Sequence, residues 1–162
     1  MTEWFRDLWQ GLSGDFQLPG GAETGQALGR AVVAILLGGV IGSERMHHGK
    51  EAGLRTHALV ALAAAFFVIA PQQAGMTGES LSRIIQGVAA GIGFIGAGTI
   101  LKHPEQRRVR GLTTAASLYF AAAIGVAAGL GREMIAALGT GAALLILGAL
   151  PKSDDSSSDV TH

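Results

Sequence analysis

The chain has 162 residues, a formal net charge of zero and no cysteine. This length predicts a single domain, zero net charge argues against nucleic acid as a partner, and the lack of cysteine excludes disulfides, thiolate zinc sites and cysteine nucleophiles. Charged residues make up only 15% of the chain, below the roughly 25% of soluble domains, so the placement of the apolar residues decides the class.

Residues 1–12 predict an amphipathic helix whose apolar face carries both tryptophans of the chain, Trp4 and Trp9. Indole rings are favoured at the membrane surface, so this helix is expected to lie in the outer interface of a bilayer; a frayed tail is the alternative. Residues 13–25 are glycine-rich and contain Pro19, which is typical of a linker. The first residues lack the apolar segment of a signal peptide, so the first spanning helix is expected to direct insertion.

The apolar residues that follow lie in long runs without charged side chains. Each run is long enough to cross roughly 30 Å of hydrocarbon, which takes about 20 residues in a helix. A soluble protein with buried helices is the alternative, but a chain this short cannot cover four such helices. The sequence therefore predicts an all-α, polytopic membrane protein. Its spanning helices are expected at about 27–44, 54–71, 84–101, 111–130 and 134–150.

Basic residues predict the orientation, because cytoplasmic loops carry an excess of Lys and Arg. Eight of them fall on one side of the expected membrane, namely Arg45, Lys50, Arg55, Lys102, Arg107, Arg108, Arg110 and Lys152, against four on the other. The N-terminus is therefore expected outside and the C-terminus in the cytoplasm. Residues 151–162 are polar and predict a disordered cytoplasmic tail, which leaves 26–150 as the transmembrane domain.

Small residues recur along three of the predicted helices, and small residues let helices pack closely in lipid. The stripes consist of Thr113, Ser117, Ala121, Gly125 and Gly129 in the fourth helix, of Gly87, Ala89, Gly91, Gly93 and Ala97 in the third, and of Ala34, Gly38 and Gly42 in the first. We expect these three helices to cross at short distance and the chain to form a homo-oligomer, most simply a dimer. A pore lining would use the same residues, so that alternative stays open.

A weak internal repeat is also present, since GLRTHALVALAAA from Gly53 parallels GLTTAASLYFAAA from Gly111. It predicts two copies of one helix hairpin related by an axis along the membrane normal, unless the match arose by chance. Thr56 and Thr114 would then occupy equivalent places near helix starts, where hydroxyl groups can bind free backbone N–H groups.

Polar residues gather at the ends of the predicted helices. Glu44 is the only acid at the end of the first helix, and Arg45, Arg55 and Arg110 are its candidate partners. Charges this close to hydrocarbon are costly unless they are paired, so an ion-pair latch and a functional site are both open. Gln86, inside the third helix, is expected to bond a neighbouring helix or to line a wet cavity.

Signatures of enzymes and of metal sites are missing from the sequence. No pair of carboxylates lies in the predicted membrane segments, and His57 has no His or Cys at ligand spacing. Gly91, Gly93 and Gly96 fit GxGxxG, but they lie inside an apolar helix rather than after a strand. There is no Walker loop and no nucleophile elbow. The sequence therefore predicts a protein that is not an enzyme and has no cofactor, and it leaves metal binding undetermined.

Three segments carry a resemblance to a known family: IGSERMHHGKEAGLRTHALVALAAAFF, RIIQGVAAGIGFIGAGTILK and VRGLTTAASLYFAAAIGVAAG. Over residues 28–130 the chain resembles the MgtC/SapB family of bacterial inner-membrane proteins. The resemblance implies a link to magnesium homeostasis, a role in virulence for pathogen members, and for some members a link to the membrane ATP synthase. Longer relatives add a soluble cytoplasmic domain, whose function is not carried over.

The resemblance also marks individual positions. The family's signature falls on Glu44, Arg45, Gly53, Leu54, Arg55, Thr56, His57, Gln86, Gly87, Gly93, Gly96, Gly98, Arg110, Gly111 and Thr114. Some relatives have Asn where Thr113 stands, so a role that needs an amide there is not carried over. We take as the candidate functional cluster Glu44, Arg45, Arg55, Thr56, His57, Gln86, Arg110, Thr113 and Thr114. The expected packing residues are Gly87, Gly93, Gly96, Gly98, Gly111, Ser117 and Gly125.

Two classes of function follow from these observations. In the first, the protein is a non-enzymatic regulator that binds another membrane complex through its small-residue helix faces. In the second, it is a channel or transporter for Mg²⁺ or another small solute. The lack of a pair of carboxylates in the spanning segments favours the first class, whereas the repeat and Gln86 keep the second open.

Overall fold

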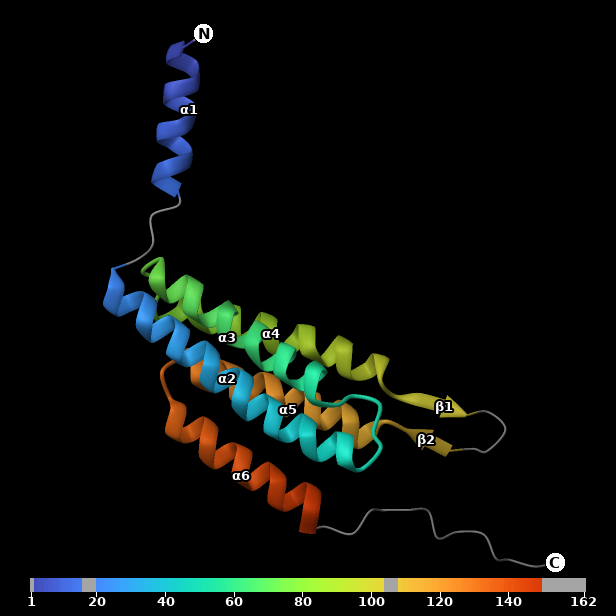
Figure 1. Cartoon of the computed structure of the whole chain (residues 1–162). Coiled ribbons are helices and arrows are strands. Elements are labelled where there is room, and N and C mark those ends of the chain that lie inside the picture. Colours follow the sequence, from blue (N-terminus) through green and yellow to red (C-terminus); the bar gives the residue numbers. More distant parts are fainter. Residues whose placement is uncertain (1, 16–19, 104–107, 150–162) are drawn as a thin grey trace, which may run out of the picture.

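The computed structural model describes residues 2–15, 20–103 and 108–149 of the chain. These residues form six helices and a short antiparallel hairpin (Figure 1). The elements are α1 (Thr2–Asp15), α2 (Gly21–His47), α3 (Leu54–Gln73), α4 (Gly78–Gly98), β1 (Leu101–His103), β2 (Arg108–Arg110), α5 (Leu112–Gly129) and α6 (Glu133–Ala149).

Helices α2 to α5 are each long and apolar enough to cross a membrane, and α6 is an apolar helix of 17 residues. The prediction of an all-α polytopic membrane protein is confirmed. The largest differences in bounds are at α2 and α4, each of which begins about six residues before its predicted start. Helix α2 begins at Gly21, inside the segment expected to be a linker. At about 1.5 Å per residue, its 27 residues span about 40 Å, more than the hydrocarbon layer alone requires.

The bundle is built around α3 and α5. Helix α2 packs against both of them, α4 packs against α5 and α3, and α6 packs against α5 and α2. In Figure 1, α4 and α6 lie on opposite sides of this central group. The core is filled by small and branched apolar side chains, including Ala34, Ile41, Ala61, Ala65 and Ile124.

The closest helix contacts are made by glycines, and α3 is the shared partner. A Cβ on Gly38 would lie 2.6 Å from the Ala61 Cβ, and one on Gly125 would overlap the Ala61 carbonyl oxygen. Gly42 and Gly129 meet the backbone of α3 in the same way. The prediction that the first and fourth helices carry close crossings is therefore correct. Their main partner is the second spanning helix, in which no small-residue stripe was identified.

The glycines predicted to pack α4 do not do so. No described atom lies within 4 Å of where a Cβ would stand on Gly87, Gly91, Gly93 or Gly98, whereas Gly96 makes ordinary contact with Ala115. The reason is geometric: α4 packs through a face that buries Ile92 and Gly96, and the stripe of Gly87, Gly91 and Gly98 lies on the opposite side. For these three positions and Gly93, the assignment to packing within the bundle is wrong.

A β-hairpin replaces the end of the third predicted helix. Helix α4 stops at Gly98, and Leu101 pairs with Arg110 in the hairpin that follows. Gly111 then adopts φ +91°, and a Cβ there would collide with the Thr99 carbonyl oxygen. A residue with a side chain would be strained by that conformation and blocked by that contact. Gly111 was predicted to pack helices, whereas the structure places it against Thr99 and Ile100 at this turn.

The N-terminal segment forms the predicted helix, α1, which stands apart from the bundle in Figure 1. The side chains of Trp4, Phe5 and Trp9 are exposed, and the rings of Trp4 and Phe5 meet edge to face at 5.2 Å. Its location at the membrane interface stays a prediction. The expected tail, 151–162, lies outside the described residues.

Candidate functional site

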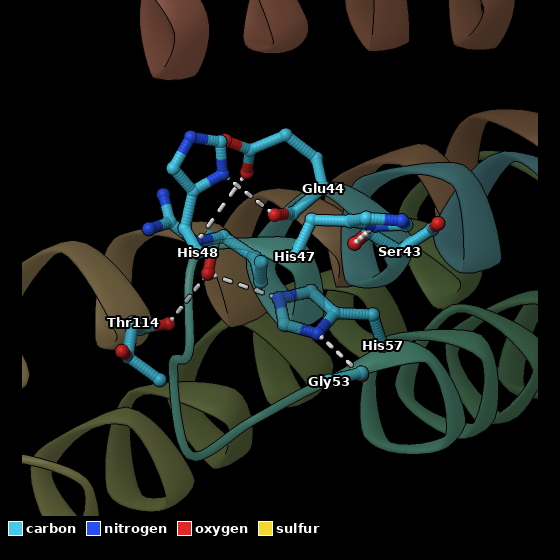
Figure 2. Close-up of polar contacts among 9 residues, drawn as sticks. Ser43, Glu44, His47, His48, Gly53, His57 and Thr114 are labelled. Atoms are coloured by element: carbon cyan, nitrogen blue, oxygen red, sulfur yellow. Dashed lines mark hydrogen bonds and ion pairs between the residues drawn. The ribbon is translucent and has the colours of Figure 1, made fainter.

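A buried polar network lies at the end of the bundle where α2 ends and α3 and α5 begin (Figure 2). We call it the basic-end cluster, because the loops with most of the basic residues leave the bundle here. Its members come from three helices and are Glu44, Arg45, His57, Thr114 and Ser117. The structure thus brings four of the nine predicted site residues together and adds Ser117.

His57 is the centre of the cluster and is fully buried. Its Nδ1 lies 2.9 Å from the Gly53 carbonyl oxygen, and its Nε2 lies 2.9 Å from Ser117 Oγ, which lies 2.9 Å from the Thr114 carbonyl oxygen. A carbonyl oxygen only accepts, so Nδ1 carries a hydrogen. The Ser117 hydroxyl can then donate to a neutral His57, or donate to Thr114 and accept from a protonated His57. The network therefore satisfies the imidazole in both protonation states.

Glu44 and Arg45 form a poorly bonded ion pair beside this network. Arg45 Nε lies 3.5 Å from Glu44 Oε2, with side chains 5% and 15% exposed. Adjacent residues do not face each other on a helix, which explains the long contact. His48 Nδ1 lies 2.9 Å from Glu44 Oε1 and donates its hydrogen bond to the Glu44 carbonyl oxygen. Among the described residues, neither carboxylate oxygen of Glu44 receives a hydrogen bond.

The other five predicted site residues are exposed and lie outside the cluster: Arg55, Thr56, Gln86, Arg110 and Thr113. The expected pairing of Glu44 with Arg55 or Arg110 is therefore wrong. Gln86 Nε2 donates to Ser82 Oγ of its own helix at 3.5 Å, so it does not bridge to a neighbouring helix. Among the described residues, no side chain caps the start of α3 or α5, so the proposed capping role of Thr56 and Thr114 is also wrong.

A second polar group lies at the opposite end of the bundle, and the sequence did not predict it as a site. Arg30 Nη1 donates to Gln72 Oε1 and to the Gly129 carbonyl oxygen, each at 3.1 Å. We call these three groups the Arg30 cluster. It ties α2, α3 and α5 together, as the basic-end cluster does. The charge of Arg30 inside an apolar run was the feature of the sequence that could have indicated this cluster. Gln72 lay just beyond the predicted end of its helix, so it was not considered as a partner.

The two clusters bound a thin apolar layer. Arg30 and Glu44 are 14 positions apart on α2, and His57 and Gln72 are 15 apart on α3. At about 1.5 Å per residue these separations are about 21 and 22 Å, less than the roughly 30 Å of a hydrocarbon core. At least one cluster must therefore lie below the hydrocarbon surface or thin the bilayer locally, and its polar groups need protein partners.

The described part of the chain contains no group of three His, Asp or Glu side chains placed to hold a metal ion. The basic-end cluster can hold a proton and tie three helices, and the Glu44 carboxylate oxygens are buried without a hydrogen-bond donor among the described residues. These are the chemical capacities that the geometry provides.

Comparison with known proteins places the chain in a family. Residues 31–155 match the profile of the MgtC family. The chain is 45% identical to Protein SrpB of Synechococcus elongatus over 73% of this chain and 71% of that protein. It is 46% identical to Protein MgtC of Salmonella typhimurium over 62% of this chain and 42% of the relative, and 47% identical to Protein MgtC of Brucella abortus over 66% and 44%.

The chain thus spans less than half the length of these two MgtC proteins. No solved structure matches it. The matched residues include most of α2, all of α3 to α6, the basic-end cluster and the glycine contacts of the core, whereas Arg30 lies one position before the match. The chain is a multi-pass membrane protein that belongs to the MgtC family.

Proposed function

We propose that this protein is a non-enzymatic regulator in the bacterial inner membrane that acts in magnesium homeostasis by binding another membrane complex. Family membership supports the link to magnesium. The observation that carries the regulatory part is the contrast between a closed bundle core and an unfilled glycine face on α4. The membrane ATP synthase is the first partner to test, because the resemblance pointed to it.

The closed core argues against a solute pathway along the bundle axis. Between the two polar clusters, Gly125 meets the backbone of α3 and the surrounding positions are filled by Ala61, Ala65, Ile124 and Ala128. These groups are apolar and offer an ion no replacement for its hydration shell. A channel or transporter for Mg²⁺ therefore needs a different conformation or an interface between copies, and it is the second candidate.

The α4 face is suited to binding another helix. Gly87, Gly91 and Gly98 line up with Phe94, which is 84% exposed, and nothing in the described protomer covers them. Small residues beside one large apolar side chain let a second helix approach closely in lipid. We propose that this face contacts the regulated complex, and that it is also the contact of a homo-oligomer.

Gly91→Leu tests this proposal, with Gly141→Leu on α6 as the matched control, because both glycines are open. Gly91→Leu should abolish the ability of the gene to support growth in low magnesium and should remove the partner from pull-downs. The control should retain both, and neither variant should unfold. Normal growth with Gly91→Leu would refute the role of this face.

Two further measurements separate the candidates. The chain lacks cysteine, so Phe94→Cys introduces a single cross-linking site on α4. A cross-linked dimer identifies a second copy as the neighbour of this face, and a larger adduct identifies another protein. Purified protein alone in liposomes should show no Mg²⁺ influx, and saturable influx would favour the transporter.

A reporter fused after Ala149 should be cytoplasmic, in keeping with the basic residues.

A further inference from the structure

A pocket of about 280 Å³ opens beside the Arg30 cluster, between the start of α2 and the end of α3. Its polar wall is formed by Glu23, Gln26, Arg30, Gln72 and Gln73. Ala27 and Ile69 supply the apolar part of the wall. A pocket with one cation, one anion and three amides is unusual in a bundle whose other surfaces are mainly apolar.

The position of the pocket puts it at the level of lipid headgroups. Arg30 is separated from Glu44 by about 21 Å along α2, which is thinner than a hydrocarbon core. Glu23 lies seven positions before Arg30, or about 10 Å further from the centre of the bundle. The pocket therefore extends from the edge of the hydrocarbon outward through the interface, where phospholipid phosphates and amines reside.

The charges in the pocket match a zwitterion. Arg30 uses Nη1 for its two protein bonds. Its Nε and Nη2 lie against Gly131, and no described residue accepts a hydrogen bond from them, so these N–H groups can donate to a phosphate. Glu23 lies on the same face of α2, two turns away, and no described residue forms an ion pair or hydrogen bond with it. One cation and one anion cancel, so a free phosphate dianion gains little net attraction, whereas a headgroup with both charges binds both residues.

We propose that this pocket binds the headgroup of an aminophospholipid, with the phosphate at Arg30 and the primary ammonium at Glu23. Gln26 and Gln73 supply amide donors to the remaining phosphate and ester oxygens. Ala27 and Ile69 line the path along which the acyl chains enter the hydrocarbon. A lipid held here also shields Arg30 where the bilayer is wider than the apolar layer of the protein.

The test is lipid retention by the purified full chain in native mass spectrometry. Phosphatidylethanolamine, phosphatidylcholine and phosphatidylglycerol with identical acyl chains are offered in equal amounts. Phosphatidylethanolamine should be retained about tenfold over the other two, a ratio typical of one added charge-assisted bond. Phosphatidylcholine has no N–H to donate to Glu23, and phosphatidylglycerol has no cation.

Glu23→Gln should abolish this preference without unfolding the protein, because Glu23 is exposed and supports no helix contact. Glu133→Gln, at an exposed acid on the same end of the bundle, should keep it. Equal retention of the three lipids, or a preference that survives Glu23→Gln, would overturn the proposal. Displacement of the lipid by millimolar inorganic phosphate would also overturn it, because the pocket would then recognise a free phosphate and not the zwitterionic headgroup.

Discussion

The two ends of the bundle both hold charged side chains near an apolar layer, but one end encloses them and the other leaves them partly open. Each end places a charged residue of α2 against α3 and α5, at the edge of an apolar layer about 21 to 22 Å thick by helix rise. At the basic end the polar groups are enclosed: His57 is 0% and Arg45 4% exposed. At the other end Arg30 is half-buried and borders an open pocket.

This difference in enclosure decides how much each charged residue contributes to the stability of the bundle. An enclosed ion pair is costly to break from one side, because the remaining charge has no water. A half-exposed guanidinium keeps access to water or to lipid phosphate, so its protein bonds contribute less. We therefore expect the basic end to exclude water and to depend on its internal bonds, and the Arg30 end to accept water or lipid in place of its protein bonds. Four substitutions test this view, beginning with the layer that joins the two ends.

Gly125→Leu should disrupt the polar contacts at both ends at once. Any side chain at this position overlaps the Ala61 carbonyl oxygen, so α5 must separate from α3. We expect a loss of more than about 4 kcal/mol in the free energy of unfolding, beyond the usual range for overpacking, because rigid backbone is displaced. The measurement is reversible unfolding in mixed micelles. Gly91→Leu, at an open position, is the control, and equal stability of the two variants would contradict the packing described for α3.

Glu44→Gln tests the enclosure of the basic end. The substitution keeps the shape of the side chain and leaves Arg45 as an uncompensated buried charge, which should cost about 3 kcal/mol. The double variant Glu44→Gln, Arg45→Met should recover most of that stability, because the pair is then replaced rather than broken. A single variant as stable as the wild type would mean that water reaches the pair, and the contrast between the two ends would fail.

Sequence reasoning found the helices because their signal is local. Charge-free runs mark the spans in α3, α5 and α6 to within two residues at each end. The predicted span of α3 ended at residue 71. The helix continues for two residues past it, which brings Gln72 to Arg30. The predicted span thus stopped one residue short of half of a polar contact.

The site was predicted less completely, since its contacts join distant segments. Ser117 was assigned to packing by its four-residue spacing, yet its hydroxyl is bonded to His57, 60 positions away. Likewise, Gly87 and Gly125 have the same sequence signature, but only Gly125 faces another helix. A stripe of small residues shows that a face can be approached closely, and it does not identify the neighbour. Only the rotation of each helix in the bundle distinguishes these cases.

Ser117→Ala should have a smaller effect on the basic end than Glu44→Gln. It removes the partner of His57 Nε2, which lies in a position without access to water. A buried polar atom left without a partner costs about 2 kcal/mol. Thr140→Ala is the matched control, because that buried hydroxyl bonds only the backbone of its own helix, 2.9 Å from the Ala136 carbonyl oxygen. If both variants lose the same stability, the link between α3 and α5 through His57 contributes nothing specific.

Arg30→Gln should have the smallest effect, although it removes a charge that joins three helices. The guanidinium gives up its bonds to Gln72 Oε1 and the Gly129 carbonyl oxygen, but the site is half-open, so water or a lipid headgroup can solvate the partners. We expect a loss of about 1 kcal/mol, in the range of partly exposed charged hydrogen bonds. Arg132→Gln, an exposed arginine at the same end, should change stability by less. A loss from Arg30→Gln as large as that from Glu44→Gln would show that the Arg30 end is as enclosed as the basic end, and that the pocket beside it does not admit water or lipid.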